Sequence, residues 1–303
     1  MFDGMLIINK PRGLTSHDVV YKIKKLVKEK VGHTGTLDPM ATGVLPICIG
    51  QATKIAQFVL CQDKKYLAEI KFGVETNSFD ITGKVLSEKK FIYNEQKVLS
   101  CIKSFIGTYL QEVPIFSAIK YKGKKLYEFA REGIDVELKK RLAKIYDIKL
   151  IKIVSQDRIW LEVRCAKGVY IRSLCHDIGK SYGCGACLNN LIRLASGDFL
   201  IKNSISLAKC ENLFKNNLLL ERIIKIDQAL DFKKVIIAIE AKKFLYNGNK
   251  IDVKFVMGEK NFCFGEKLFV YDDIKRLVGI YELKENYLCP VRIFTGGFCD
   301  NFK

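Results

Sequence analysis

The sequence of 303 residues lacks any apolar run long enough to cross a membrane. Its richest apolar stretch, residues 235–239, ends within the length of a strand, whereas a spanning helix needs about 20 apolar residues. Residues 1–4 also lack the basic segment, followed by an apolar one, that marks a secretory signal. We therefore expect a cytoplasmic protein that makes no membrane contact.

The sequence is poor in histidine, with only three, and this limits several kinds of catalysis. Ser-His-Asp and Cys-His mechanisms have few possible bases, and neither a Gly-x-Ser-x-Gly elbow nor a Walker-type phosphate loop occurs. Cys184 and Cys187 form a Cys-x-x-Cys motif, but no second such motif or pair of histidines completes a zinc site. The eleven cysteines are odd in number and scattered, so we expect reduced thiols and no metal site.

Positive charge is what the sequence has in excess. Lys and Arg number 51 against 33 Asp and Glu, a formal net charge of +18. Such a surplus favours a polyanionic partner, with nucleic acid the leading candidate, because neutralising phosphates supplies most non-specific binding energy. A hydrophobic fraction of 49% supports real cores and excludes disorder of the whole chain.

Apolar spacing along the chain predicts an α+β fold, because strands and helices are mixed without regular βα alternation. The expected elements are strands over residues 5–9, 65–74, 144–154 and 158–165, helices that are capped at Thr15 or Ser16, over 94–110 and from 171, and a loop over 31–46. Alternation in the second strand places Tyr66 at its entrance, on the face of Ala68, Ile70, Phe72 and Val74.

The pattern changes near residue 233, which predicts two domains, residues 1–232 and 233–303. The second contains short β-like runs separated by turn signals, over residues 235–239, 267–271, 277–283 and 290–294. We therefore expect a small β-rich C-terminal domain.

Cations and aromatic residues are interleaved in residues 114–133. Such a mixture fits an arm that grips nucleic acid. An ordinary basic loop leading into a helix is the alternative, and both interpretations stay open on the residues alone.

Asp38 lies in the glycine-rich stretch between Leu37 and Pro39. A carboxylate can act as nucleophile or base at a sugar carbon if a cation or hydrogen-bond donors hold it. Seen alone, an aspartate at such a position is more often a turn former.

The surroundings of Asp38 change this interpretation. Residues 32–46 (GHTGTLDPMATGVLP) closely resemble the signature of the TruB family of tRNA pseudouridine synthases. Three separate segments also resemble family motifs in the right order: KPRGLTS at 10–16, DKKY at 63–66 and KGVYIRSL at 167–174. The resemblance thus covers the chain from about residue 5 to residue 200.

By this resemblance Asp38 is the catalytic aspartate, Arg172 is the cation that pairs with it and orients it, and Tyr66 stacks on the target base. An Arg–carboxylate pair can fix geometry through two hydrogen bonds, and an aromatic face suits a flipped pyrimidine. Arg172 would also favour the ionised carboxylate by lowering the pKa of Asp38.

Five further residues are expected to bind the RNA. His33 resembles the family residue that fills the space left by the flipped nucleotide, and Tyr170 and Leu194 resemble residues of the base pocket, although a core role would explain them equally. We also expect RNA contacts from Lys10, in the first motif, and Lys120, because residues 114–133 resemble the family's RNA-gripping insertion.

The chain departs from the family pattern in two places. Residues 76–80 read TNSFD where the family often has TDTxD, so that Asn77 replaces one carboxylate and only Asp80 is retained. Ile192 replaces one of two arginines that are commonly adjacent near residues 191–194.

The resemblance implies a catalytic domain with a mixed or antiparallel sheet and a PUA-like C-terminal domain. It also implies isomerisation of uridine 55 in the T loop of tRNA, with the T arm as partner, no cofactor and no protein partner, and we expect a monomer. Two alternatives remain: the catalytic subunit of a guide-RNA ribonucleoprotein, and a tRNA-binding and folding protein whose catalysis is secondary. Glycoside hydrolysis is disfavoured, because it normally needs two positioned carboxylates and a water.

Overall fold

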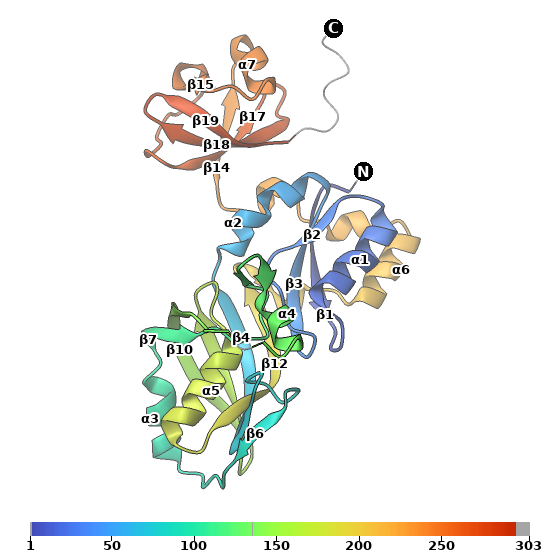
Figure 1. Ribbon diagram of the computed structural model, residues 1–303. Coiled ribbons are helices and arrows are strands. Elements are labelled where there is room, and N and C mark those ends of the chain that lie inside the picture. Colours follow the sequence, from blue (N-terminus) through green and yellow to red (C-terminus); the bar gives the residue numbers. More distant parts are fainter. Residues whose placement is uncertain (1, 135, 295–303) are drawn as a thin grey trace.

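The computed structural model describes residues 2–134 and 136–294. It contains a large mixed sheet covered by helices and a second, smaller sheet formed by the C-terminal residues (Figure 1). The helices are α1 Ser16–Val27, α2 Ala56–Leu60, α3 Glu95–Lys103, α4 Leu126–Arg131, α5 Ile171–Tyr182, α6 Leu207–Lys215 and α7 Lys242–Tyr246. The predicted α+β class is thereby confirmed. No helix of the described residues is long and apolar enough to cross a bilayer.

The large sheet has nine strands, seven of them in the order β1-β3-β12-β4-β11-β10-β7. They are β1 Gly4–Lys10, β3 Thr42–Ile49, β12 Ala186–Ser196, β4 Lys64–Phe72, β11 Arg158–Cys165, β10 Lys140–Ser155 and β7 Gly107–Glu112, with β2 Val31–His33 beside β3 and β13 Phe199–Leu200 beside β12. All neighbours are antiparallel except β3 and β12. The two short hairpins are β5 Val74–Thr76 with β6 Val85–Glu88, and β8 Lys120–Tyr121 with β9 Lys124–Lys125.

The parallel junction of β3 and β12 depends on a glycine. Gly43 has φ +102° and faces the Arg193 backbone so closely that a β-carbon there would overlap it. Only glycine tolerates both conditions. This junction brings the chain around residue 193 against the end of the Asp38 loop.

Helix α1 begins where the sequence predicts, because Thr15 and Asp18 form a capping box at its N-terminus. The apolar stripe of α5 is also confirmed, since Ile171, Leu174, Cys175, Ile178 and Tyr182 are all buried. The main core lies between these helices, α3, α6 and the nine-stranded sheet.

Three expectations about the first 110 residues are wrong in part. The helix expected over residues 94–110 ends at Lys103, and β7 follows from Gly107, whose φ of +110° is incompatible with a helix. The loop expected over residues 31–46 is shorter, because β2 includes residues 31–33 and β3 starts at Thr42. Pro46 favours a loop in the sequence, because proline is rare inside a sheet. In the structure it lies within β3 and pairs with Ile7 of β1. Val74 lies beyond the end of β4, in β5.

The second sheet has six strands in the order β15-β19-β18-β17-β14-β16. They are β14 Lys233–Ile237, β15 Ile251–Asp252, β16 Val256–Met257, β17 Lys267–Tyr271, β18 Leu277–Lys284 and β19 Tyr287–Ile293. Each β-like run expected beyond residue 233 therefore corresponds to a strand. Short 3-10 helices connect other elements at Gly50–Ile55, Ile201–Asn203, Leu219–Arg222, Ile226–Gln228, Ile239–Ala241 and Val253–Phe255.

Phe232 packs against α2 and β17 at the point where the chain enters β14. Its ring centroid lies 5.6 Å from that of Phe58 in α2 and 5.4 Å from that of Phe269 in β17. Lys54 donates a hydrogen bond across the same junction to the Ile293 carbonyl, and Arg292 donates one to the Gln57 side chain.

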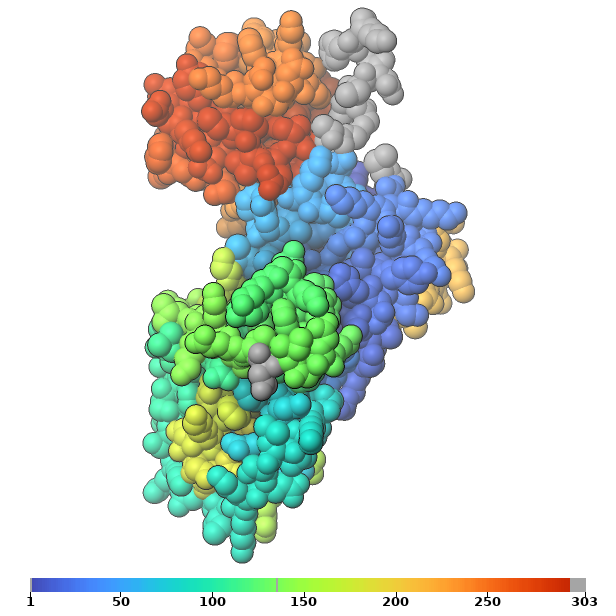
Figure 2. Space-filling view, viewed as in Figure 1, coloured from blue at the N-terminus to red at the C-terminus, as the bar shows by residue number. Residues whose placement is uncertain are grey.

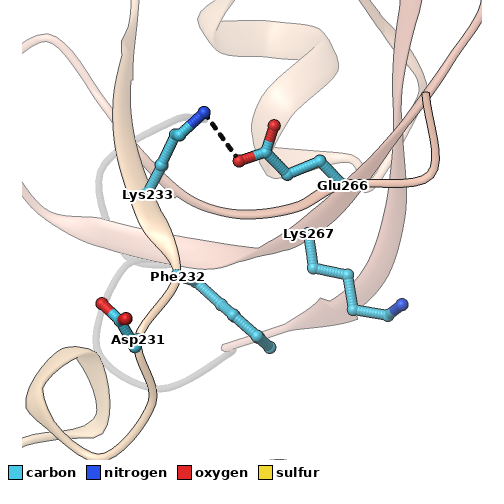
Figure 3. A pocket seen from close by; sticks show the side chains of 5 residues that line it. All are labelled: Asp231, Phe232, Lys233, Glu266 and Lys267. Atoms are coloured by element: carbon cyan, nitrogen blue, oxygen red, sulfur yellow. Dashed lines mark ion pairs between the residues drawn. The ribbon is translucent and has the colours of Figure 1, made fainter. Parts of the chain in front are cut away.

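A cavity of about 540 Å³ lies beside Phe232 and is lined by Asp231, Phe232, Lys233, Glu266 and Lys267 (Figure 3).

Candidate active site

Asp38 lies in the loop of residues 34–41 that connects β2 to β3. The buried Ser16 hydroxyl, at the start of α1, donates to the Leu37 carbonyl at 3.1 Å and accepts from the Leu37 amide at 2.9 Å. The Gly13 amide donates to the Pro39 carbonyl at 2.7 Å. The first motif, residues 10–16, therefore holds the Asp38 loop on both sides of the aspartate.

Lys10 is fully buried, and this differs from the RNA contact expected from the sequence. Its ammonium donates to the carbonyl oxygens of Pro11 at 2.8 Å, Leu14 at 2.7 Å and Pro39 at 3.3 Å. Burial lowers the pKa of Lys10 to about 8, while the nearby charge of Asp38 acts in the opposite direction. The structure thus places Lys10 under the Asp38 loop.

Arg193 holds the other end of the same loop. Its side chain is buried and donates to the carbonyls of Val44 at 2.6 Å, Gly35 at 3.0 Å and Thr36 at 3.5 Å. Buried carbonyls need such partners, because an unpaired one loses its hydration without compensation. Arg193 and Lys10 thus fix the loop from its two ends.

Arg172 and Asp38 form a bidentate ion pair. The Arg172 Nε lies 2.9 Å from Asp38 Oδ2, and Nη2 donates to Oδ1 at 3.3 Å. The Asp38 side chain is 35% exposed and that of Arg172 only 5%, so the carboxylate faces outward from a buried cation. The pairing expected between these residues is present in the structure.

Three other groups fix the Arg172 guanidinium from behind. Nη1 lies 3.7 Å from an Asp80 carboxylate oxygen and donates to the Ser78 carbonyl at 3.2 Å. Nη2 also donates to the Phe116 carbonyl, at 2.8 Å. The arginine is therefore held by two further segments of the chain besides the Asp38 loop.

Partial loss of hydration at this site raises the pKa of Asp38 above its ordinary value, although part of the side chain stays exposed. Arg172 acts in the opposite direction, as expected from the sequence, but burial outweighs it and the negative charge of Asp80 adds to the rise. Arg172 thus lowers the pKa of Asp38, as expected, but the net shift of that pKa is upward.

Tyr66 lies on β4, directly opposite Arg193 of β12. Its side chain is buried, and the burial raises the pKa of the phenol, which also receives a hydrogen bond from Arg193 and feels the charge of Asp38. The charge of Asp38 thus acts on the Tyr66 phenol, and the stacking of Tyr66 on a target base stays a prediction.

Two of the remaining predicted residues lie on β2 and β12. His33 ends β2, and burial together with His17 and Arg193 lowers its pKa to about 4. Leu194 is half-buried on β12, next to Arg193.

Tyr170 lies at the start of α5, and Lys120 lies in the basic segment of residues 114–133. Tyr170 precedes α5, and the Arg141 guanidinium lies 4.4 Å from its ring centroid. Lys120 is exposed on β8, in the segment of residues 114–133 that folds into the β8–β9 hairpin and α4. This segment forms the raised green surface in the face shown (Figure 2).

No group of three or more His, Cys, Asp and Glu side chains in residues 2–134 and 136–294 is placed to hold a metal ion. Cys184 and Cys187 are buried free thiols. The cavity beside Phe232 is lined by none of the predicted site residues.

Sequence reasoning gave no role to two residues that the structure places at the site, Asp80 and Arg193. Asp80 could have been found as the carboxylate retained at residues 76–80. Arg193 could have been found as a lone cation among the apolar residues Leu191, Ile192 and Leu194.

Comparisons with known proteins identify the family of this chain. The sequence model of the TruB family pseudouridylate synthase N-terminal domain matches residues 23–171, and that of the tRNA pseudouridylate synthase B C-terminal domain matches residues 172–231. A protein of Alkaliphilus oremlandii named tRNA pseudouridine synthase B is 44% identical over 279 residues, which cover 91% of this chain and 92% of the relative. A protein of the same name from Bacillus licheniformis is 43% identical over 306 residues, with 97% and 98% covered.

Two solved structures share the fold. A Cbf5-Nop10-Gar1 complex contains a chain with a TM-score of 0.73 and 26% identity, covering 96% of this chain and 85% of that one. An H/ACA RNP bound to a substrate RNA containing 2'-deoxyuridine gives a TM-score of 0.72 and 25% identity, with 97% and 85% covered. With motifs, paired site residues and relatives in agreement, the chain belongs to the TruB family of pseudouridylate synthases.

Proposed function

We propose that this chain is a tRNA pseudouridine synthase that isomerises uridine 55 in the T loop. The observation that carries the proposal is the bidentate pair of Arg172 and Asp38, whose carboxylate charge acts on the buried phenol of Tyr66. The names of the relatives support tRNA as the substrate. The position of the uridine and the T arm are inferred from the family resemblance.

The reaction exchanges one glycosidic bond for another. The N1–C1′ bond breaks, the uracil turns while it stays bound, and C5 joins C1′, after which the C5 hydrogen leaves as a proton and N1 gains one. No oxidation or hydrolysis occurs, so that no cofactor is required.

Asp38 must be ionised and close to the sugar for this chemistry. Arg172 holds the carboxylate in one orientation, and its second hydrogen bond prevents rotation about the first. Because burial raises the pKa of Asp38, we expect activity to fall on the acid side at a higher pH than for an ordinary aspartate.

The target base must leave its stack, which costs a few kcal/mol. Tyr66 would stack on the flipped base, Tyr170 and Leu194 would complete the pocket, and His33 would fill the vacated space. Lys10 instead positions the Asp38 loop, because its ammonium is already bound by three carbonyls.

Binding of the RNA is assigned to two further regions. Residues 114–133 present Lys120 and other lysines on an exposed hairpin and would grip the T arm. Residues 233–303 would form a PUA-like domain that contacts another part of the tRNA, with the domain boundary at 232/233. We expect the protein to act as a cytoplasmic monomer without a protein partner.

The experiment is tritium release from a tRNA transcript labelled at C5 of uracil, with no guide RNA added. We expect release with the wild type and none with Asp38→Asn, while both proteins bind the transcript with similar affinity. A matched control is Asp198→Asn, a carboxylate in the turn between β12 and β13, which should release tritium at the wild-type rate. A folded wild type that binds tRNA and releases nothing would contradict the proposal.

A guide-RNA-dependent enzyme is the second candidate, because the H/ACA and Cbf5 structures share this fold. The folded segment of residues 114–133 argues against it, since the guided enzymes are expected to lack this insertion. Release of tritium only after a guide RNA is added would favour this candidate. A tRNA-folding role would instead be supported if tRNA refolding survived in Asp38→Asn.

A further inference from the structure

The strand β7 and the residues after it run beside the N-terminus of α5. The Ser173 hydroxyl donates to the Glu112 carbonyl at 2.8 Å, and Arg172 donates to the Phe116 carbonyl at 2.8 Å. The Gln111 side chain contacts the backbone of Tyr170. Three residues around the start of α5 are thus attached to one segment, and that segment leads into the basic insertion.

Gln111 makes the most specific of these contacts. Its Oε1 accepts from the Tyr170 amide at 2.8 Å, and its Nε2 donates to the Tyr170 carbonyl at 3.0 Å. Nε2 also donates to the Tyr109 hydroxyl at 2.6 Å. The side-chain amide therefore uses its oxygen and both of its N–H groups, although the residue is completely buried.

Tyr170 is the N-cap of α5, so that its carbonyl also accepts the first helical hydrogen bond, from the Leu174 amide at 3.1 Å. Gln111 thus holds both polar groups of the residue that begins the helix. Arg141, the cross-strand partner of Gln111, lies over the ring of the same tyrosine. Tyr170 is consequently held through its backbone by β7 and through its ring by β10.

Burying a side-chain amide costs hydration free energy. A leucine of similar size would avoid the loss of hydration, which hydrogen bonds only offset. The benefit of glutamine here is geometric, because its two hydrogen bonds fix the N–H and the carbonyl of Tyr170, which belong to successive peptide groups. Arg172 follows two residues later, and its 2.9 Å contact with Asp38 depends on where the helix begins.

We propose that Gln111 is a positioning residue for the pseudouridine synthase reaction, whose amide fixes the start of α5 and thereby holds Arg172 against Asp38 and Tyr170 in the base pocket. This inference rests on the proposed function of Asp38 and Arg172. A misplacement of about 1 Å at a reacting group can cost about 100-fold in rate. Gln111 touches neither the carboxylate nor the exposed lysines that would bind RNA, so its effect should be on turnover.

The test compares three variants of the full-length protein. Gln111→Leu removes both bonds to Tyr170, and we expect kcat to fall about 10- to 100-fold with KM and tRNA affinity within about twofold of wild type. Tyr109→Phe removes only the hydroxyl and leaves the two bonds to Tyr170, so it should keep kcat within about threefold. Gln156→Leu, at an exposed glutamine in the turn between β10 and β11, is the control for the substitution itself.

A second readout does not depend on activity. The titration of the Asp38 carboxyl, followed by carbon NMR, should move to higher pH in Gln111→Leu, because Arg172 is the main cation that opposes the rise of the Asp38 pKa. Lys10 and Asp80, the other charged groups that act on Asp38, are untouched by the substitution. A purely structural role would lower the midpoint of unfolding and leave this titration unchanged.

The outcomes separate the two proposals. Normal kcat per folded molecule and an unchanged Asp38 titration in Gln111→Leu would overturn the positioning role. A wild type without activity, combined with a shifted Asp38 titration in Gln111→Leu, would overturn the proposed function and support the positioning of Arg172 by Gln111. Equal losses of kcat in Gln111→Leu and Tyr109→Phe would overturn the assignment to the Tyr170 contacts.

Discussion

Arg172 binds Asp38 through two nitrogens, at 2.9 and 3.3 Å, and the remaining N–H groups of its guanidinium also face acceptors. Those acceptors are Asp80, the Ser78 carbonyl and the Phe116 carbonyl. A planar group with five donors can satisfy such a set, whereas the point charge of a lysine cannot.

Arg172→Lys should therefore keep a positive charge but lose activity. We expect kcat to fall about 100-fold, since orientation of the carboxylate and not charge alone is required. A lysine that lacks the two close contacts lowers the pKa of Asp38 less than Arg172 does, so that the rise caused by burial becomes larger. Because the ionised form is the active one, the acid limb of the kcat/KM profile should move to higher pH. An acid limb at the wild-type position would contradict the pairing.

Arg193 is expected to act through stability. Arg193→Met removes the partner of the Val44, Gly35 and Thr36 carbonyls, and we expect the free energy of unfolding to fall by about 3 kcal/mol. Urea denaturation measures the loss. Arg222→Met, at an exposed arginine, should change the same quantity by less than about 0.5 kcal/mol, and equal losses would show that Arg193 has no special role.

Much of the fold could be predicted because its signals are local. The capping residues before α1, the alternation in β4 and the apolar stripe of α5 are each contained in about a dozen residues, and each corresponds to the observed element. The errors occur where partners distant in sequence decide. Pro46 is accepted within β3 because β1 pairs with that strand, and the helix of residues 95–103 ends where Gly107 turns the chain into the sheet.

The site shows the same division. The family resemblance predicts the pairing of Arg172 with Asp38 and marks Tyr66. The contacts of Arg172 with the Ser78 and Phe116 carbonyls could not be predicted, since these residues come from separate elements. A lysine is expected at the surface. Lys10 is nevertheless buried, because three carbonyls bind its ammonium. Gln111 carries no signal in the sequence, and its hydrogen bonds to Tyr170 join residues 59 positions apart.

The lysines of the insertion should contribute to affinity for tRNA. Replacing Lys120, Lys124 and Lys125 together by alanine should weaken binding at least tenfold at near-physiological salt and reduce the salt slope by about two or three. The matched control replaces the exposed Lys22, Lys24 and Lys28 of the α1 segment, which changes the net charge equally. Filter binding at several salt concentrations measures both, and equal losses in the two triple variants would mean that net charge alone matters.

His33 should make the protein sensitive to acid. Burial lowers its pKa to about 4 from the ordinary 6.5. On acidification the unfolded chain therefore binds a proton at His33 at a higher pH than the folded protein does. Stability contributed by the neutral ring is thus lost as the pH falls through 6.5 towards 4, by about 2 kcal/mol between about pH 7 and about pH 5. Urea unfolding at both pH values should show this loss in the wild type and not in His33→Gln. His17→Gln removes the neighbouring ring, 5.4 Å away, and should keep most of the loss, because burial of His33 is the main cause of its lowered pKa. If His33→Gln loses as much stability as the wild type, the acid sensitivity arises elsewhere.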